Sequence, residues 1–265
     1  MAPASAVRRR IYRHPAPVRL AHWAGALALG VLAMSGMQIF NAHPALYASD
    51  ASTFERPVLS LGSAQDAGGN PIGYVQLGRH FRINTTHVLG FGPDGMGGET
   101  PRGFPSWATI PAFQDLAGGR RWHIFFAWLL ILCGLAYARW SLRLWPGLQD
   151  LRALPATLRA HLPPWRVKAA RRLNPLQKTS YFGIVFVLVP LMIVSGLALS
   201  PSADAWVPWL PALLGGRQFA RLWHFAGMFA LLAFFVVHLL MVALTGLRNN
   251  MRSMISGWYV VEDEP

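Results

Sequence analysis

LWHFAGMFALLAFFVVHLLMVALTGL, from Leu222 to Leu247, is the stretch of sequence that decides the fold. It contains no Asp, Glu, Lys or Arg, and it exceeds the roughly 20 helical residues that cross the ~30 Å hydrocarbon core of a bilayer. In lipid, every backbone polar group must be hydrogen-bonded within the segment, so we predict one transmembrane helix. His224 and His238 are therefore two polar side chains on a single membrane helix.

Three further blocks share this composition, at residues 20–40, 122–138 and 179–200. The whole chain has 265 residues, of which 53% are hydrophobic and only 13% are charged, too little charge for the surface of a soluble domain of this size. We predict an all-α membrane protein, a four-transmembrane-helix bundle forming one domain over residues 1–265. Pro190 should kink the third span locally.

The distribution of basic residues predicts the orientation. Of the 24 Lys and Arg residues, 16 lie before the first span, in the link at residues 139–178, or after the fourth span. With four spans these three segments face one side, and the positive-inside rule places both termini and the link in the cytoplasm of a bacterial cell, with the chain in its inner membrane. The net charge of +13 then favours lipid headgroups rather than nucleic acid as the anionic partner.

Residues 41–120 fall on the periplasmic side in this topology. They are rich in glycine and proline, so we predict a long irregular cap that covers a cofactor or docks a partner. Its histidines, His43, His80 and His87, either line a docking surface, bind a metal or are merely solvated. The single cysteine, Cys133, excludes an internal disulfide and a cysteine-ligated iron–sulfur cluster.

Four histidines within the spans pair by depth. His22 begins the first span on the cytoplasmic side, and His238 lies towards the inner end of the fourth. His123 begins the second span on the outer side, as His224 does the fourth. His224 and His238 are 14 residues apart, which is about 21 Å along a helix and about 40° short of four full turns. One helix can therefore ligate two stacked cofactors.

Two imidazoles at one depth, with no carboxylate near them, fit a six-coordinate haem better than zinc, which usually takes four clustered ligands. Such an iron has no open position for a substrate, so electron transfer is favoured. Arginines at span ends could pair with haem propionates or anchor the helices at headgroups. These candidates are Arg19, Arg120, Arg121 and Arg221.

A short sequence echo links the first and third spans. MSGM at residues 34–37 resembles VSGL at residues 194–197. Small residues let a neighbouring helix or a flat cofactor approach the backbone closely, and both readings stay open.

The histidine motifs resemble those of a known family. RHP at 13–15 with RLAHW at 19–23 resembles the opening of the bacterial cytochrome b561 family, which includes b-type cytochrome subunits of nickel–iron hydrogenases and formate dehydrogenase. RWH at 121–123 and LWH at 222–224 are similar to its other ligand motifs. The resemblance implies that His22 and His238 hold an inner haem b, and His123 and His224 an outer one.

The resemblance also implies a quinone site. NPLQK at 174–178 is similar to the family's entry to the third span, so Asn174, Gln177 or Lys178 could bind a quinone carbonyl; a helix cap at Asn174 with a snorkelling lysine is the alternative. QIFNAHP at 38–44 resembles thiosulfate-reductase-type members, which implies a periplasmic molybdopterin oxidoreductase as partner.

The sequence thus predicts a di-haem cytochrome carrying electrons between a periplasmic oxidoreductase and the quinone pool. A stand-alone superoxide/quinone oxidoreductase is the alternative. A histidine-using transporter is a remote one, because no span has an acidic or basic residue at mid-depth. The direction of electron flow stays open.

Overall fold

The computed structural model describes residues 7–50, 52–142, 145–160 and 173–263. The predicted link at 139–178 therefore lies partly outside the described residues. Contacts divide the chain into two units, each described separately below. The first contains Met1–Ala24, Leu132–Pro190 and Phe229–Pro265; the second contains Gly25–Ile131 and Leu191–Met228.

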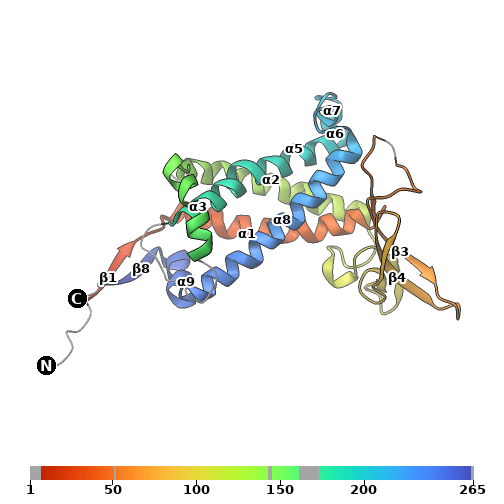
Figure 1. Cartoon of the computed structure of the whole chain (residues 1–265), viewed down its shortest axis with the longest axis horizontal. Helices are drawn as coiled ribbons and strands as arrows, with labels where there is room; N and C mark the ends of the chain where they lie inside the picture. Colours follow the sequence, from red (N-terminus) through yellow and green to blue (C-terminus); the bar gives the residue numbers. More distant parts are fainter. Residues whose placement is uncertain (1–6, 51, 143–144, 161–172, 264–265) are drawn as a thin grey trace. The chain divides into compact units, whose positions relative to one another are not determined.

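Long helical segments dominate the structure (Figure 1). They are α1 (Ala16–Phe40), α2 (Leu116–Ser141), the run α4 (Pro175–Phe182), η4 (Gly183–Leu188) and α5 (Val189–Leu199), and α8 (Arg217–Leu244). Among the described residues, three segments are long and apolar enough to cross a membrane: Ala16–Phe40, Pro175–Leu199 and Arg217–Leu244. The predicted second span lies inside α2, and the count of four spans stays a prediction.

The third apolar segment contains a widened turn just before Pro190. Residues Gly183–Leu188 are π-helical, and the backbone N–H of Val189 donates to the carbonyl of Ile184, five residues earlier. Proline has no N–H to donate to the carbonyl of Phe186, four residues before it. A local π-helical turn is a common way for a helix to absorb such a missing bond.

The two ends of the chain form a small sheet in the first unit. Strand β1 (Val7–Tyr12) pairs antiparallel with β8 (Trp258–Asp263), from Val7 opposite Asp263 to Tyr12 opposite Trp258 (Figure 1). The prediction of an all-α protein is therefore wrong at the ends. The basic residues before the first span predicted only the orientation of the chain. Their neighbours Val7, Ile11 and Tyr12 are the β-branched and aromatic residues that favour strands.

Short helices complete the first unit. They are α3 (Leu148–Ala160) and α9 (Leu247–Ser256). The indole Nε1 of Trp23 donates to the carbonyl of Met254 at 3.0 Å, so α9 is tied back to the beginning of α1.

The predicted irregular cap contains β-structure in the second unit. Four antiparallel strands form one sheet in the order β2 (Ala45–Leu46), β3 (Leu59–Gln65), β4 (Pro71–Leu77) and β5 (Phe81–Asn84). A hairpin pairs β6 (Gly90–Pro93) with β7 (Glu99–Arg102). The remaining elements are η1 (Ser106–Ala108), α6 (Pro201–Asp204) and α7 (Leu210–Leu213). The prediction of an irregular segment is thus wrong.

The prediction of an irregular cap was based on its glycines, but in the structure these glycines permit close packing of strands. A Cβ on Gly73 would lie 2.3 Å from the carbonyl oxygen of Leu89, and Gly90 has φ +81°. These glycines allow the hairpin to approach the sheet, whereas composition alone indicated turns. Phe40, Leu46, Leu61 and Phe104 then form a buried cluster against which Leu222 and Phe225 pack.

A buried arginine holds the cap together. Arg102 is 4% exposed. Its guanidinium donates to the carbonyl of Phe104 at 2.7 Å and to the carbonyls of Pro93, Asp94 and Ala112 at 3.1–3.2 Å. It thereby supplies the hydrogen bonds that the turns around it lack.

The end of α1 is bonded to the same region. Asn41 accepts from the backbone N–H of Phe104 at 2.6 Å and donates to its carbonyl at 3.1 Å. Gln38, fully buried, donates to the carbonyl of Phe113 at 2.8 Å. The cap is therefore anchored to α1 by polar contacts as well as by the Phe40 cluster.

Arg102→Ala should destabilise the cap by at least about 3 kcal/mol, because several buried carbonyls would lose their donor. Limited proteolysis and thermal melting of the detergent-solubilised protein would measure this, with Arg79→Ala, an exposed arginine of the same segment, as the matched control. Equal protease resistance of the two variants would contradict this account of the cap.

Candidate functional site

His123 and His224 meet in the second unit. His123 lies on α2 and His224 on α8, and their ring centres are 6.0 Å apart with planes at 63°. Both side chains are half-buried. The structure thus brings together one of the two predicted pairs.

Each of these histidines is hydrogen-bonded to a buried serine. The Oγ of Ser35 on α1 lies 3.0 Å from Nδ1 of His123, and the Oγ of Ser195 on α5 lies 3.0 Å from Nδ1 of His224. Both serines are 0% exposed. The two contacts are equivalent, although they come from different helices.

The serine hydroxyls determine which ring nitrogen carries the proton. Ser35 donates its one hydroxyl proton to the carbonyl of Val31 at 2.7 Å, and Ser195 donates to the carbonyl of Leu191 at 2.6 Å. Each Oγ can then only accept from the imidazole, so the proton is on Nδ1. Nε2 keeps its lone pair, which is the state in which histidine binds a metal.

A glycine follows each serine and lies against the same ring. A Cβ added to Gly36 would sit 3.3 Å from Cε1 of His123, and one added to Gly196 would sit 3.2 Å from Cε1 of His224. The sequence echo of the first and third spans is therefore a repeated Ser-Gly cradle for a histidine.

His22 and His238 meet in the first unit. His22 lies on α1 and His238 on α8, with ring centres 6.2 Å apart and planes at 52°. The ring of Phe234 stacks on His238 at 5.8 Å. Nδ1 of His22 is buried and has no hydrogen-bond partner among the described residues. The structure therefore brings together the second predicted pair, without a serine cradle at His22.

The separations of both pairs fit one metal bound between two imidazoles. A histidine nitrogen binds a metal at about 2 Å, and the ring centre lies about 1 Å beyond, so opposed rings have centres roughly 6 Å apart. In the described parts of the chain, no group of three or more His, Cys, Asp or Glu side chains could hold a metal ion. A porphyrin, which supplies four nitrogens of its own, fits a two-histidine site.

The family model of prokaryotic cytochrome b561 matches residues 13–257. The chain belongs to the prokaryotic cytochrome b561 family. It is therefore a b-haem electron-transfer protein of the membrane, and family membership implies haem b as its cofactor.

Curated relatives of this b561-family chain are subunits of oxidoreductases by name. A putative protein-methionine-sulfoxide reductase subunit YedZ1 of Azospira oryzae is 40% identical over 136 residues, covering 49% of this chain and 67% of the relative. A probable Ni/Fe-hydrogenase B-type cytochrome subunit of Cupriavidus necator is 25% identical, covering 95% of this chain and 88% of its own. One of Azotobacter vinelandii is 24% identical, covering 96% and 90%.

The two leading propionate candidates of this b561-family protein lie in different surroundings. Arg19 donates to the carbonyl of Ile255, while its Nε is buried without a partner in the described structure. Arg121 is exposed and lines a cavity of about 200 Å³ with Trp122 and Phe125. Arg221, a further candidate, donates to the carbonyl of His43. The propionate assignments stay predictions.

The quinone candidates of the NPLQK motif make local contacts. Asn174 accepts from the backbone N–H of Gln177 at 2.8 Å, and the Gln177 side chain accepts from the backbone N–H of Asn174 at 3.2 Å, a capping box for α4. Lys178 Nζ lies 2.7 Å from a carboxylate oxygen of Asp150. The quinone assignment of these residues stays a prediction, and the capping alternative describes the geometry of Asn174.

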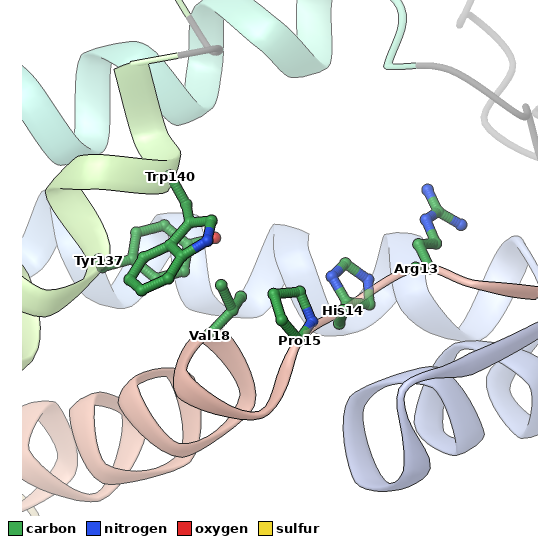
Figure 2. A pocket seen from close by; sticks show the side chains of 6 residues that line it. All are labelled: Arg13, His14, Pro15, Val18, Tyr137 and Trp140. Carbon is green, nitrogen blue, oxygen red and sulfur yellow. The ribbon is translucent and has the colours of Figure 1, made fainter.

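A second cavity in the first unit is lined by polar and aromatic side chains. It measures about 340 Å³ and lies between the segment leading into α1 and the end of α2 (Figure 2). Its lining residues are Arg13, His14, Pro15, Val18, Tyr137 and Trp140. Sequence analysis identified none of them as ligand-binding, because they come from distant segments.

His14 in this cavity is neutral at physiological pH. Burial lowers the pKa of His14 to about 4, and the positive charge of Arg13 adds to the effect. A neutral imidazole both donates and accepts a hydrogen bond, which suits a ligand that carries carbonyl or hydroxyl groups.

The cap histidines are not assembled into a site. Nε2 of His43 lies 3.1 Å from the hydroxyl of Tyr47, and Nδ1 of His87 lies 2.7 Å from Glu99. His80 is exposed. The alternative of a metal site in the cap therefore has no support among the described residues.

Gly36→Ala and Gly196→Ala should each lower haem loading at the His123–His224 pair, because the new methyl group would press on the histidine ring. Haem per chain, measured by a pyridine haemochrome assay, would report the loss. Gly30→Ala is the matched control on α1, since nothing lies within 4 Å of its added Cβ. Full loading in all three variants would contradict the cradle.

Proposed function

We propose that this chain holds two haem b groups and passes electrons across the inner membrane between a periplasmic oxidoreductase and the quinone pool. The observation that carries the proposal is the pair of histidine sites, with ring centres 6.0 and 6.2 Å apart, that share helix α8. His123 and His224 would hold one haem, and His22 and His238 the other.

The ligand set favours electron transfer over substrate chemistry. When bound, haem b supplies a one-electron carrier. The protein offers two imidazoles at each site, which would leave no open position on a bound haem iron. At the His22–His238 site an apolar side chain, Phe234, stacks beside His238 and helps to exclude water.

Pairing of the chain ends supports the four-span topology. Strand β1 precedes α1 and strand β8 follows α8 and α9, and their six residue pairs hold both ends together. Both ends then lie on one side of the membrane, which requires an even number of spans. Three helical segments among the described residues meet the criteria for a span, so we assign α2, which carries His123, as the fourth.

The cap supports a partner protein rather than a stand-alone enzyme. The cap, residues 41–120, contains a folded sheet and a hairpin, and Phe104 in it is anchored to Asn41 at the end of α1. Exposed aromatic side chains, including Phe54 and Trp107, remain on it. Exposed apolar groups of this kind are typical of interaction surfaces. The relatives named as subunits point the same way.

The cavity of Arg13 and His14 supports the quinone end of the pathway. A quinone ring is flat, apolar and carries two carbonyls. Tyr137 and Trp140 supply aromatic walls, and neutral His14 with Arg13 supplies hydrogen-bond donors (Figure 2). The cavity of about 340 Å³ is at the lower end of the range for small-molecule sites. It belongs to the same unit as His22 and His238.

A quinol should reduce the protein through the His22–His238 site. Stopped-flow absorbance after mixing oxidised protein with a reduced short-chain quinone should show haem reduction, and His238→Ala should slow it at least tenfold while dithionite still reduces the remaining haem. His80→Ala, an exposed cap histidine, is the control. Quinol reduction of His238→Ala at the wild-type rate would contradict the proposed route.

Two groups of variants distinguish the possible quinone sites. His14→Ala, which removes a hydrogen-bond donor, and Tyr137→Ala, which removes an aromatic wall, should each raise the KM for quinol about three- to tenfold. Asn174→Ala should lower the melting temperature, because it removes a helix cap, and leave the KM unchanged. If Asn174→Ala raised the KM for quinol and His14→Ala left it unchanged, the quinone site would instead lie at Asn174.

A further inference from the structure

The two histidine sites differ in the hydrogen bonds that Nδ1 of their histidines makes. At one site, Nδ1 of His123 donates to Ser35 and Nδ1 of His224 donates to Ser195, each at 3.0 Å. At the other, Nδ1 of His22 is buried and has no partner in the described structure. This asymmetry concerns the atoms that control how strongly an imidazole donates electrons to a metal.

A hydrogen bond from Nδ1–H to an acceptor makes the imidazole a more basic ligand. A more basic ligand stabilises the oxidised iron more than the reduced iron, so the reduction potential falls. Each serine oxygen is a capable acceptor here, because its own proton is donated to a backbone carbonyl. The effect should be larger in a water-free helix bundle than in solvent.

Nearby positive charge does not separate the two sites. Arg19 lies three residues before His22, Arg121 two residues before His123, and Arg221 three residues before His224. Arg121 is exposed, so solvent screens its charge. One less exposed arginine then remains beside each site, Arg19 at one and Arg221 at the other, and cations raise the reduction potential at both. The serine contacts remain as a difference in hydrogen bonding between the two sites.

We propose that Ser35 and Ser195 are positioning residues that present Nε2 of His123 and His224 to iron. Their hydrogen bonds hold the His123–His224 site at a lower reduction potential than the His22–His238 site. Electrons therefore run from the His123–His224 site to the His22–His238 site. With haem bound, the group held by His123 and His224 would give up one electron, and the group held by His22 and His238 would gain it. No bond forms or breaks, and no proton moves. The inference rests on the proposed di-haem function and assigns its direction, towards quinone reduction.

Redox titration of single-haem proteins tests this proposal. His22→Ala should retain the haem of the His123–His224 site, and His123→Ala should retain the other. The midpoint potential of the first protein should lie below that of the second. Adding Ser35→Ala or Ser195→Ala to His22→Ala should raise its potential, and both together should raise it further.

A spectroscopic readout and a matched control accompany the titration. In electron paramagnetic resonance of the oxidised His22→Ala protein, the added substitution Ser35→Ala should shift the g values in the direction that reports weaker axial ligands. Thr245→Ala is the control, since Thr245 also donates to the carbonyl four residues earlier, at 2.7 Å, and contacts no histidine in the described structure. It should change neither the potential nor the spectrum.

Two results would overturn the inference. One is a higher midpoint potential in His22→Ala than in His123→Ala. This comparison can be made even if the serine variants fail to retain haem. The other is an unchanged potential in haem-loaded Ser35→Ala and Ser195→Ala proteins. Failure of the proposed function is distinct from both, because it would show as an absence of the second haem in the unsubstituted protein.

Discussion

A histidine inside the hydrocarbon core needs a partner for its ring nitrogens, because no water is there to supply one. Four histidines of this chain lie in apolar helices, and the structure resolves them into two pairs with ring centres 6.0 and 6.2 Å apart. Iron bound between the rings would satisfy one nitrogen of each. The remaining nitrogens of His123 and His224 are satisfied by Ser35 and Ser195.

Helix α8 is the shared element of both sites, since it carries His224 and His238. Around His123 and His224, the Ser-Gly sequence of α1 and that of α5 do the same work: the hydroxyl binds Nδ1, and the glycine leaves room for the ring. The cap, which hydrogen bonds of Arg102 and Asn41 hold together, adds a folded surface to these helices. Haem binding by the helices and the partner docking that we propose for the cap thus rest on separate parts of one sequence.

The sequence predicted the helices and the histidine pairs because both depend on local chemistry: uninterrupted apolar runs and polar residues at matching depths. It missed the sheet of residues 45–84 because Gly73 and its neighbours read as turns, although they permit close strand packing. Similarly, it missed the β1–β8 pairing, which joins opposite ends of the chain. The similarity of MSGM and VSGL could be seen in the sequence, but only the serine–histidine distances in the structure show what these residues do. The cavity of His14 and Tyr137 could not be found, because two distant segments form it.

Counting haem in double histidine variants tests the central claim most directly. Each single substitution should reduce two haems per chain to one. His22→Ala with His238→Ala removes both ligands of the same site and should still leave one haem, whereas His22→Ala with His123→Ala should leave none. If the first double variant lost both haems, or the second kept one at full loading, the pairing of the histidines described above would be wrong.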